Sequence, residues 1–136
     1  MSLAKLVKPV IKATFDYPAM PGFEVELAYL TRDELQKIRN KCVTTKIDRR
    51  TREPKEEVDN ELFESLYYKA IVTGWKGLKH KYLPKLGPFE LDTGMDPDSE
   101  EIYEPDGAVV LMQNSPDFNS WVSDQMEDVE NFTKRV

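Results

Sequence analysis

The hydrophobic pattern of this chain changes period near Leu30, and this change constrains the fold more than any other feature. Residues 23–29 alternate apolar and polar side chains, which is the period of a half-buried strand. Residues 10–17 mix β-branched and aromatic side chains and predict another strand. Prolines and a glycine between residues 18 and 22 interrupt the two stretches, because proline lacks the ladder donor and glycine permits a turn. We therefore expect a β-hairpin over residues 10–30.

A helical period replaces the strand period from Thr31 onward. Thr31 and Glu34 have the spacing of a capping box, in which each side chain accepts a hydrogen bond from the backbone amide of the other. Leu35, Ile38 and Cys42 lie on one face of the helix that this box opens. Cys42 is the only cysteine, so the chain has no internal disulfide, and we interpret it as a small core residue.

Residues 43–58 are rich in lysine and arginine, and Pro54 interrupts any regular element there. The pattern leaves two alternatives open, a short second hairpin or a mobile loop. Asp59 then predicts the start of a strong helix that runs to Gly74 or slightly beyond. The residues expected on its apolar face are Leu62, Phe63, Leu66, Tyr67, Ala70 and Ile71.

Carboxylates crowd into residues 92–106. Seven aspartates and glutamates, Gly94 and two prolines fall within these fifteen positions. Like charges at this density repel, and the prolines block pairing, so the stretch predicts an exposed, flexible acidic loop. A short apolar segment over residues 107–112 follows, before the last helix.

The acidic loop does not match a calcium-binding loop. Asp96, Asp98 and Glu100 alternate as the first three ligands of an EF-hand do. The loop requires glycine at its sixth position, where this chain has Glu101, and a bidentate glutamate at its twelfth, where it has Gly107. We therefore predict no metal site here.

The last third of the chain predicts an amphipathic helix that ends near residue 132. Ser115 is a suitable cap, and Pro116 and Asp117 are favoured in the first helical turn. Such a helix buries its apolar face either in the core of the protein or against a partner. The residues that we expect to contact a partner are Phe118, Trp121, Val122, Val129 and Phe132.

Length and composition predict one domain over residues 1–136. No apolar run approaches the roughly 20 residues that cross a bilayer. The first residues lack the apolar stretch of a secretory signal, and a single cysteine is compatible with a reducing compartment. We expect a soluble protein of the cytoplasm that makes no contact with a membrane.

The charges are divided unequally along the chain. Residues 1–82 have 16 Lys and Arg against 12 Asp and Glu, a net charge of +4, whereas residues 83–136 have 3 against 13, a net charge of −10. Phosphate would repel the acidic half, which makes wholesale binding of nucleic acid unlikely. The asymmetry fits self-association between unlike faces, or a partner with basic segments.

The residues do not indicate catalysis. His80 is the only histidine and lies far along the chain from Cys42, so the sequence contains neither a zinc pattern nor a triad pattern. We predict a protein that is not an enzyme and has no cofactor. Its expected fold is α+β, mostly helical, with an N-terminal β-hairpin followed by a small helical bundle.

Three separated stretches together resemble a known family. They are residues 22–35, residues 68–78, and residues 114–122 with 128–132. Their order is similar to that of the tail assembly chaperones of long-tailed bacteriophages and prophages, over most of residues 10–133. The acidic loop at residues 92–106 departs from the pattern of this family.

The resemblance implies a non-enzymatic protein that binds the helical tape measure protein during tail assembly and is absent from the finished virion. It also implies a longer form, made by ribosomal frameshifting near the end of the gene, that recruits tail tube subunits. Two alternatives stay open: a structural head–tail joining component that remains in the particle, and a small nucleic-acid-binding regulator that uses the basic stretch around residues 46–55.

Overall fold

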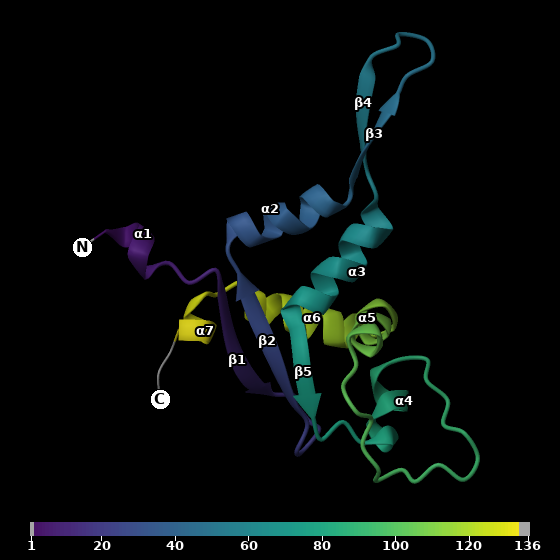
Figure 1. The fold of residues 1–136 in the computed structure, drawn as a ribbon. Helices are drawn as coiled ribbons and strands as arrows, with labels where there is room; N and C mark the ends of the chain where they lie inside the picture. Colours follow the sequence, from purple (N-terminus) through teal and green to yellow (C-terminus); the bar gives the residue numbers. More distant parts are fainter. Residues whose placement is uncertain (1, 134–136) are drawn as a thin grey trace.

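The computed structural model describes residues 2–133 and shows an α+β fold built around a three-stranded antiparallel sheet (Figure 1). The strands of this sheet are β1 (Val10–Asp16), β2 (Glu24–Leu30) and β5 (Val72–Lys76), in the order β1–β2–β5. A second sheet pairs β3 (Val43–Ile47) with β4 (Pro54–Val58). The helices are α1 (Leu3–Leu6), α2 (Arg32–Lys41), α3 (Asn60–Ile71), the 3₁₀ helix η1 (His80–Tyr82), α4 (Leu83–Leu86), α5 (Pro105–Asn114), α6 (Pro116–Met126) and α7 (Glu130–Thr133). None of these helices has the length and hydropathy that a membrane crossing requires.

The predicted N-terminal hairpin is confirmed. β1 and β2 pair along their whole length, beginning with Val10 opposite Leu30. The turn between them closes with a 2.9 Å hydrogen bond that the Tyr17 amide donates to the Phe23 carbonyl oxygen. At the end of the hairpin, the Thr31 hydroxyl accepts from a backbone amide of α2 and caps this helix, as the sequence predicts.

The strand β5 replaces the end of a predicted helix. The helix expected to run to Gly74 stops at Ile71, and the next residues pair with β2. Val72 and Thr73 are β-branched, which lowers their preference for helix and raises it for strand. With this third strand, the chain has a sheet on which the C-terminal helices pack, instead of the separate helical bundle that the sequence predicted.

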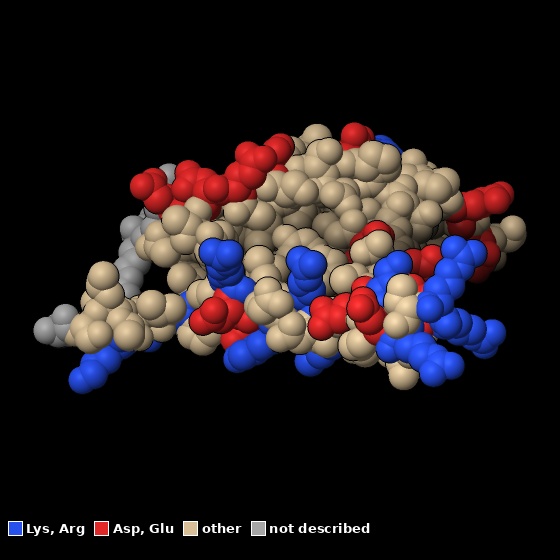
Figure 2. Space-filling model, turned by 90° about the horizontal axis from the view of Figure 1, so that it is seen from above, with Lys and Arg blue, Asp and Glu red and all other residues tan. Residues whose placement is uncertain are grey.

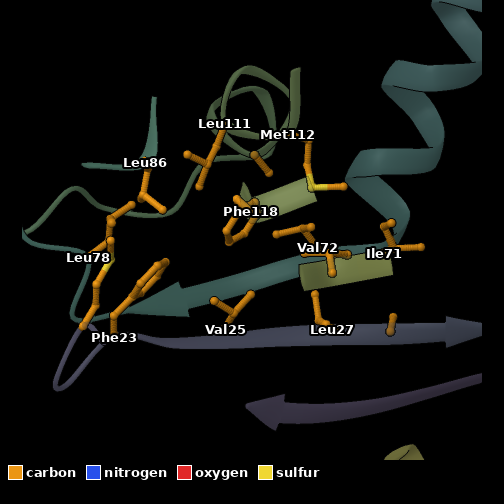
Figure 3. Close-up of a cluster of buried hydrophobic side chains, with 14 of the residues drawn as sticks. Phe23, Val25, Leu27, Ile71, Val72, Leu78, Leu86, Leu111, Met112 and Phe118 are labelled. Carbon is orange, nitrogen blue, oxygen red and sulfur yellow. The ribbon is translucent and has the colours of Figure 1, made fainter. Parts of the chain in front are cut away.

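The core lies between one face of the sheet and the helices α3, α5 and α6; in Figure 1, α6 passes behind the sheet, α5 lies to its right, and α3 rises from the upper end of β5. In Figure 3 the side chains of Val25, Leu27 and Val72 point from the strands toward the helices. Phe118 of α6 is fully buried against them, and Phe23 stacks on it at a centroid distance of 6.4 Å. Each such buried aromatic or aliphatic side chain contributes about 1.5–3 kcal/mol to folding.

The last helix is broken, in contrast to the continuous helix predicted to residue 132. α6 ends at Met126, and the chain turns before α7 begins at Glu130. The turn brings Phe132 back over β1, where its ring packs edge to face on Phe15 at 5.4 Å and against Tyr29. Phe132 is only 5% exposed, so the chain end is part of the core.

The basic stretch at residues 43–58 is a hairpin, the first of the two alternatives left by the sequence. β3 and β4 pair along five residues each, and this hairpin, called the arm below, projects from the body of the molecule beyond α2 and α3 (Figure 1). Most of its side chains are exposed, Val43 and Asp48 being partly buried. Cys42, at the base of the arm, is 1% exposed, as expected of a core residue.

The acidic stretch has no regular structure from residue 92 to 104, and α5 begins inside the predicted loop, at Pro105. Residues 92–104 are called the acidic segment below. Backbone hydrogen bonds attach its second half to η1 and to Leu78: the amides of His80 and Lys81 donate to the carbonyls of Ser99 and Pro97, and the Glu101 amide donates to the Leu78 carbonyl. The prediction of flexibility for this loop stays a prediction, and these bonds oppose it.

We expect Phe132→Ala to destabilise the protein, because the side chain fills a site between β1 and β2. The loss is expected to be about 2–3 kcal/mol, slightly below the range for a fully enclosed phenylalanine. Val129→Ala is the matched control, since Val129 is 42% exposed. Thermal unfolding followed by circular dichroism measures both variants, and equal midpoints for the two would contradict the packing of the chain end.

Candidate protein-binding groove

The residues predicted to contact a partner do not form an exposed face. Phe118, Val122 and Phe132 are buried in the core, and Trp121 is half-buried against Phe15 and Tyr17. The inward face of α6 therefore closes the fold of the protein itself, which is the first of the two destinations that an amphipathic helix allows. Among the predicted residues only Val129 is exposed, and its prediction as a partner contact stays a prediction.

A different surface of the same helices forms a groove. It has a volume of about 350 Å³ and runs between α3 and α6, with α5 at its base. Ile71 and Met112 are buried at the base, while Phe63, Tyr67 and Met126 are partly exposed on its walls. The complete lining is Asn60, Phe63, Glu64, Tyr67, Tyr68, Ile71, Met112, Asn119, Ser123 and Met126.

Aromatic rings line the α3 side of the groove. Phe63 and Tyr67 are one helical turn apart, and their rings stack with a centroid distance of 5.9 Å and an interplanar angle of 7°. Burial raises the pKa of Tyr67 above its ordinary value, and the electrostatic effect of Tyr68 adds to the shift. Tyr67 is therefore neutral at physiological pH and offers an apolar ring together with a hydroxyl group.

Hydrogen bonds fix the position of α6 relative to α3 and α5. The Asn119 side-chain amide donates at 3.1 Å to the Tyr68 hydroxyl and at 3.1 Å to the backbone oxygen of Met112. Gln113 donates at 3.3 Å to the Glu64 carboxylate across the neighbouring surface. The groove is thus preformed, with an apolar interior and a polar rim, which is the usual composition of a protein-binding groove.

The sequence placed Phe63 and Tyr67 on the apolar face of one helix but gave no sign of the groove. Its opposite wall comes from Met126, about sixty residues further along the chain. The i, i+4 spacing of the aromatic residues on α3 is the signal that marks an apolar surface there. Which element faces this surface depends on the packing of α6 across the sheet, and no local pattern encodes that packing.

A histidine cluster lies outside the groove, at the acidic segment. The His80 ring contacts the Ser99 hydroxyl at 2.7 Å through Nδ1 and the Glu101 carboxylate at 2.8 Å through Nε2. These are the residue types of a serine hydrolase triad. The Ser99 hydroxyl, however, donates its proton to the Asp96 backbone oxygen at 2.7 Å and so is not directed at His80 as a nucleophile would be. The cluster acts as a clamp that holds the acidic segment against η1.

The remaining carboxylates do not converge. Within residues 2–133, no three His, Cys, Asp or Glu side chains are close enough together to hold a metal ion.

The ion pair between Lys81 and Asp98, at 3.0 Å, lowers the pKa of Asp98 chiefly through its hydrogen bond. This pair joins the acidic segment to η1 at a second point beside the His80 clamp.

We expect His80→Ala to release the acidic segment, because the clamp is lost while the core stays intact. A glutamate-specific protease is then expected to cleave at Glu100 and Glu101 at least tenfold faster, since cleavage requires local opening. Lys85→Ala is the control, as Lys85 is exposed and lies outside the clamp. Unchanged cleavage of the His80 variant would show that the clamp does not hold the segment.

No family model, no curated protein and no solved structure matches this chain. The groove and the clamp are therefore the structural features from which a function can be proposed.

Proposed function

We propose that this protein is a non-enzymatic tail assembly chaperone of a long-tailed bacteriophage or prophage, which binds helical segments of the tape measure protein in the cytoplasm of the bacterial host. The observation that supports it best is the preformed groove between α3 and α6, which has the shape and lining that an amphipathic helix requires. The likeness of residues 22–35, residues 68–78, and residues 114–122 with 128–132 to this chaperone family supplies the identity of the helical partner.

A helix fits this groove because both walls are helices. Side chains of a partner helix at positions i, i+3, i+4 and i+7 are expected to enter between the ridges of α3 and α6, as in other helix-in-groove complexes. Phe63 and Tyr67 supply rigid aromatic area on one wall. The rim residues Glu64, Asn119 and Ser123 supply polar groups for the edges of the partner helix.

The composition of the groove suits a partner of variable sequence. Met112 and Met126 have flexible, polarisable side chains, which adapt to different apolar residues. A chaperone that covers a long helical protein meets many different turns of that protein, so it requires adaptable contacts rather than one deep, selective pocket. Several such contacts along one partner are expected to add through their effective concentration.

We expect a double variant in the groove, Phe63→Lys with Met126→Lys, to lose co-purification with the tape measure protein at least tenfold, because each substitution places a charge in the apolar interface. The matched control is Leu62→Lys with Val129→Lys. Leu62 and Val129 are 41% and 42% exposed, adjoin the same helices and lie outside the groove.

The two double variants add the same charge, so a difference between them reports the location of the contact. Both are expected to keep their thermal midpoints within a few degrees, because all four side chains are at least partly exposed. If the control variant loses the partner while the groove variant keeps it, the contact lies at Leu62 or Val129 and not in the groove.

We further expect purified virions to lack this protein, as a chaperone leaves the tail when assembly is complete. Mass spectrometry of particles produced from the same host measures this directly. A stoichiometric amount in the particle would favour the alternative of a head–tail joining component. If the protein forms a salt-dependent complex with DNA, and neutralising the charges of the arm abolishes that complex, the alternative of a regulator is favoured.

A further inference from the structure

One face of the arm carries an apolar pair at each end. In the register of the hairpin, Val43 lies opposite Val58 and Ile47 lies opposite Pro54, and the polar pair Thr45 and Glu56 lies between them on the same face. Ile47 is 72% exposed and Val58 is 38% exposed. Single exposed apolar residues are ordinary, but Ile47 and Pro54 together leave an exposed apolar pair near the tip of a projecting ribbon.

Inside the arm, the stabilising contacts are few. A two-stranded hairpin is at best marginally stable without a third strand or a covering layer. Lys46 lies directly opposite Lys55, and like charges at such positions weaken the pair, although Lys46 also reaches Glu57 at 3.1 Å. A contact with another surface would supply the cover that the arm lacks.

The tip of the arm carries three arginines, Arg49, Arg50 and Arg52. None of them has a carboxylate partner within 4.0 Å among residues 2–133. Arg52 has a φ of +58°, a left-handed conformation in which glycine or asparagine is the usual residue.

The acidic segment has the complementary chemistry. No lysine or arginine occurs between Lys85 and Lys134, a stretch that contains 13 aspartates and glutamates. Within the segment Ile102 is 74% exposed and Met95 is 38% exposed, so apolar side chains stand among the carboxylates. The segment thus pairs apolar area with negative charge, while the arm, which has five lysines and arginines against four aspartates and glutamates, carries its excess positive charge on the arginines of its tip.

We infer that the arm of one copy of this protein docks on the acidic segment of a second copy. Arginines at the tip then face carboxylates of the segment, while Ile47 and Ile102 supply apolar contact. The two surfaces lie at opposite ends of the molecule in Figure 1, so an arm does not reach the acidic segment of its own chain. The contact is therefore head to tail, and its repetition forms a ring or an open chain of subunits.

The surface charge of the molecule is consistent with such a contact. Figure 2, which looks down on the arm end, shows lysines and arginines gathered along the lower side, whereas most of the opposite edge carries only acidic or uncharged residues. The arm comprises residues 43–58, fewer than the roughly 20–30 residues on one side of a standard interface. Each contact is consequently weak and depends strongly on electrostatic attraction.

The test uses the full chain in sedimentation velocity, from about ten to several hundred micromolar. At about 0.05 M salt we expect the mean mass to rise with concentration above the 15.8 kDa of one chain. At about 1 M salt, where the Debye length falls to about 3 Å, we expect a monomer. The association constant is expected to fall at least tenfold between these conditions.

Two charge-reversed variants locate the contact. The arm variant is Arg49→Glu, Arg50→Glu and Arg52→Glu; the segment variant is Asp92→Lys, Glu100→Lys and Glu104→Lys. Each alone is expected to be a folded monomer at low salt: the arm variant has an acidic arm as well as an acidic segment, and the three lysines of the segment variant cancel the three carboxylates left in its segment. A mixture of the two is expected to associate again, because the unchanged arm of the segment variant then meets the unchanged segment of the arm variant.

The control variant, Lys5→Glu, Lys8→Glu and Arg32→Glu, changes the net charge as much as the arm variant and is expected to associate as the wild type does. Circular dichroism of every variant separates a lost contact from a lost fold. A wild type that is monomeric at low salt, an arm variant that still associates, or a mixture that stays monomeric would each overturn the inference. If the wild type is monomeric and its arm binds a DNA fragment, the arm is a phosphate-binding surface and not a contact between copies.

Discussion

The fold depends on covering one face of a small sheet. Three strands present an apolar face that cannot remain in water, and the chain covers it with its last helices, which supply Phe118 and Val122. A cluster of aromatic rings joins the hairpin to these helices, with Tyr17 within 4.9 Å of Trp121 between ring centroids. The apolar face of α6 is therefore used in the core of the protein itself.

Two surfaces remain after the core is formed. The groove between α3 and α6 is apolar and preformed, whereas the arm is polar at its tip and stands away from the body. The proposed function uses the groove to bind a helix, and the inferred contact between copies uses the charge of the arm. The two surfaces do not overlap, so neither interaction blocks the other.

Local signals in the sequence predicted the elements that depend on neighbouring residues. The hairpin at residues 10–30, the cap at Thr31 and the start of α6 at Ser115 are all set by turn and cap chemistry. β5 was missed because its strand partner lies about 45 residues earlier, and the helical pattern before it ran on without a breaker. The groove was missed for the same reason, as its two walls meet only after the whole chain has packed.

The contact between Phe15 and Phe132 also governs the order in which the molecule can be completed. A ribosome releases the hairpin before α7, so the inner face of the hairpin stays bare until the ring of Phe132 has been made. The nascent chain exposes apolar strand surface throughout that interval, the condition under which incomplete domains aggregate. The seal also places α7 on the N-terminal side of the sheet, away from the arm (Figure 1).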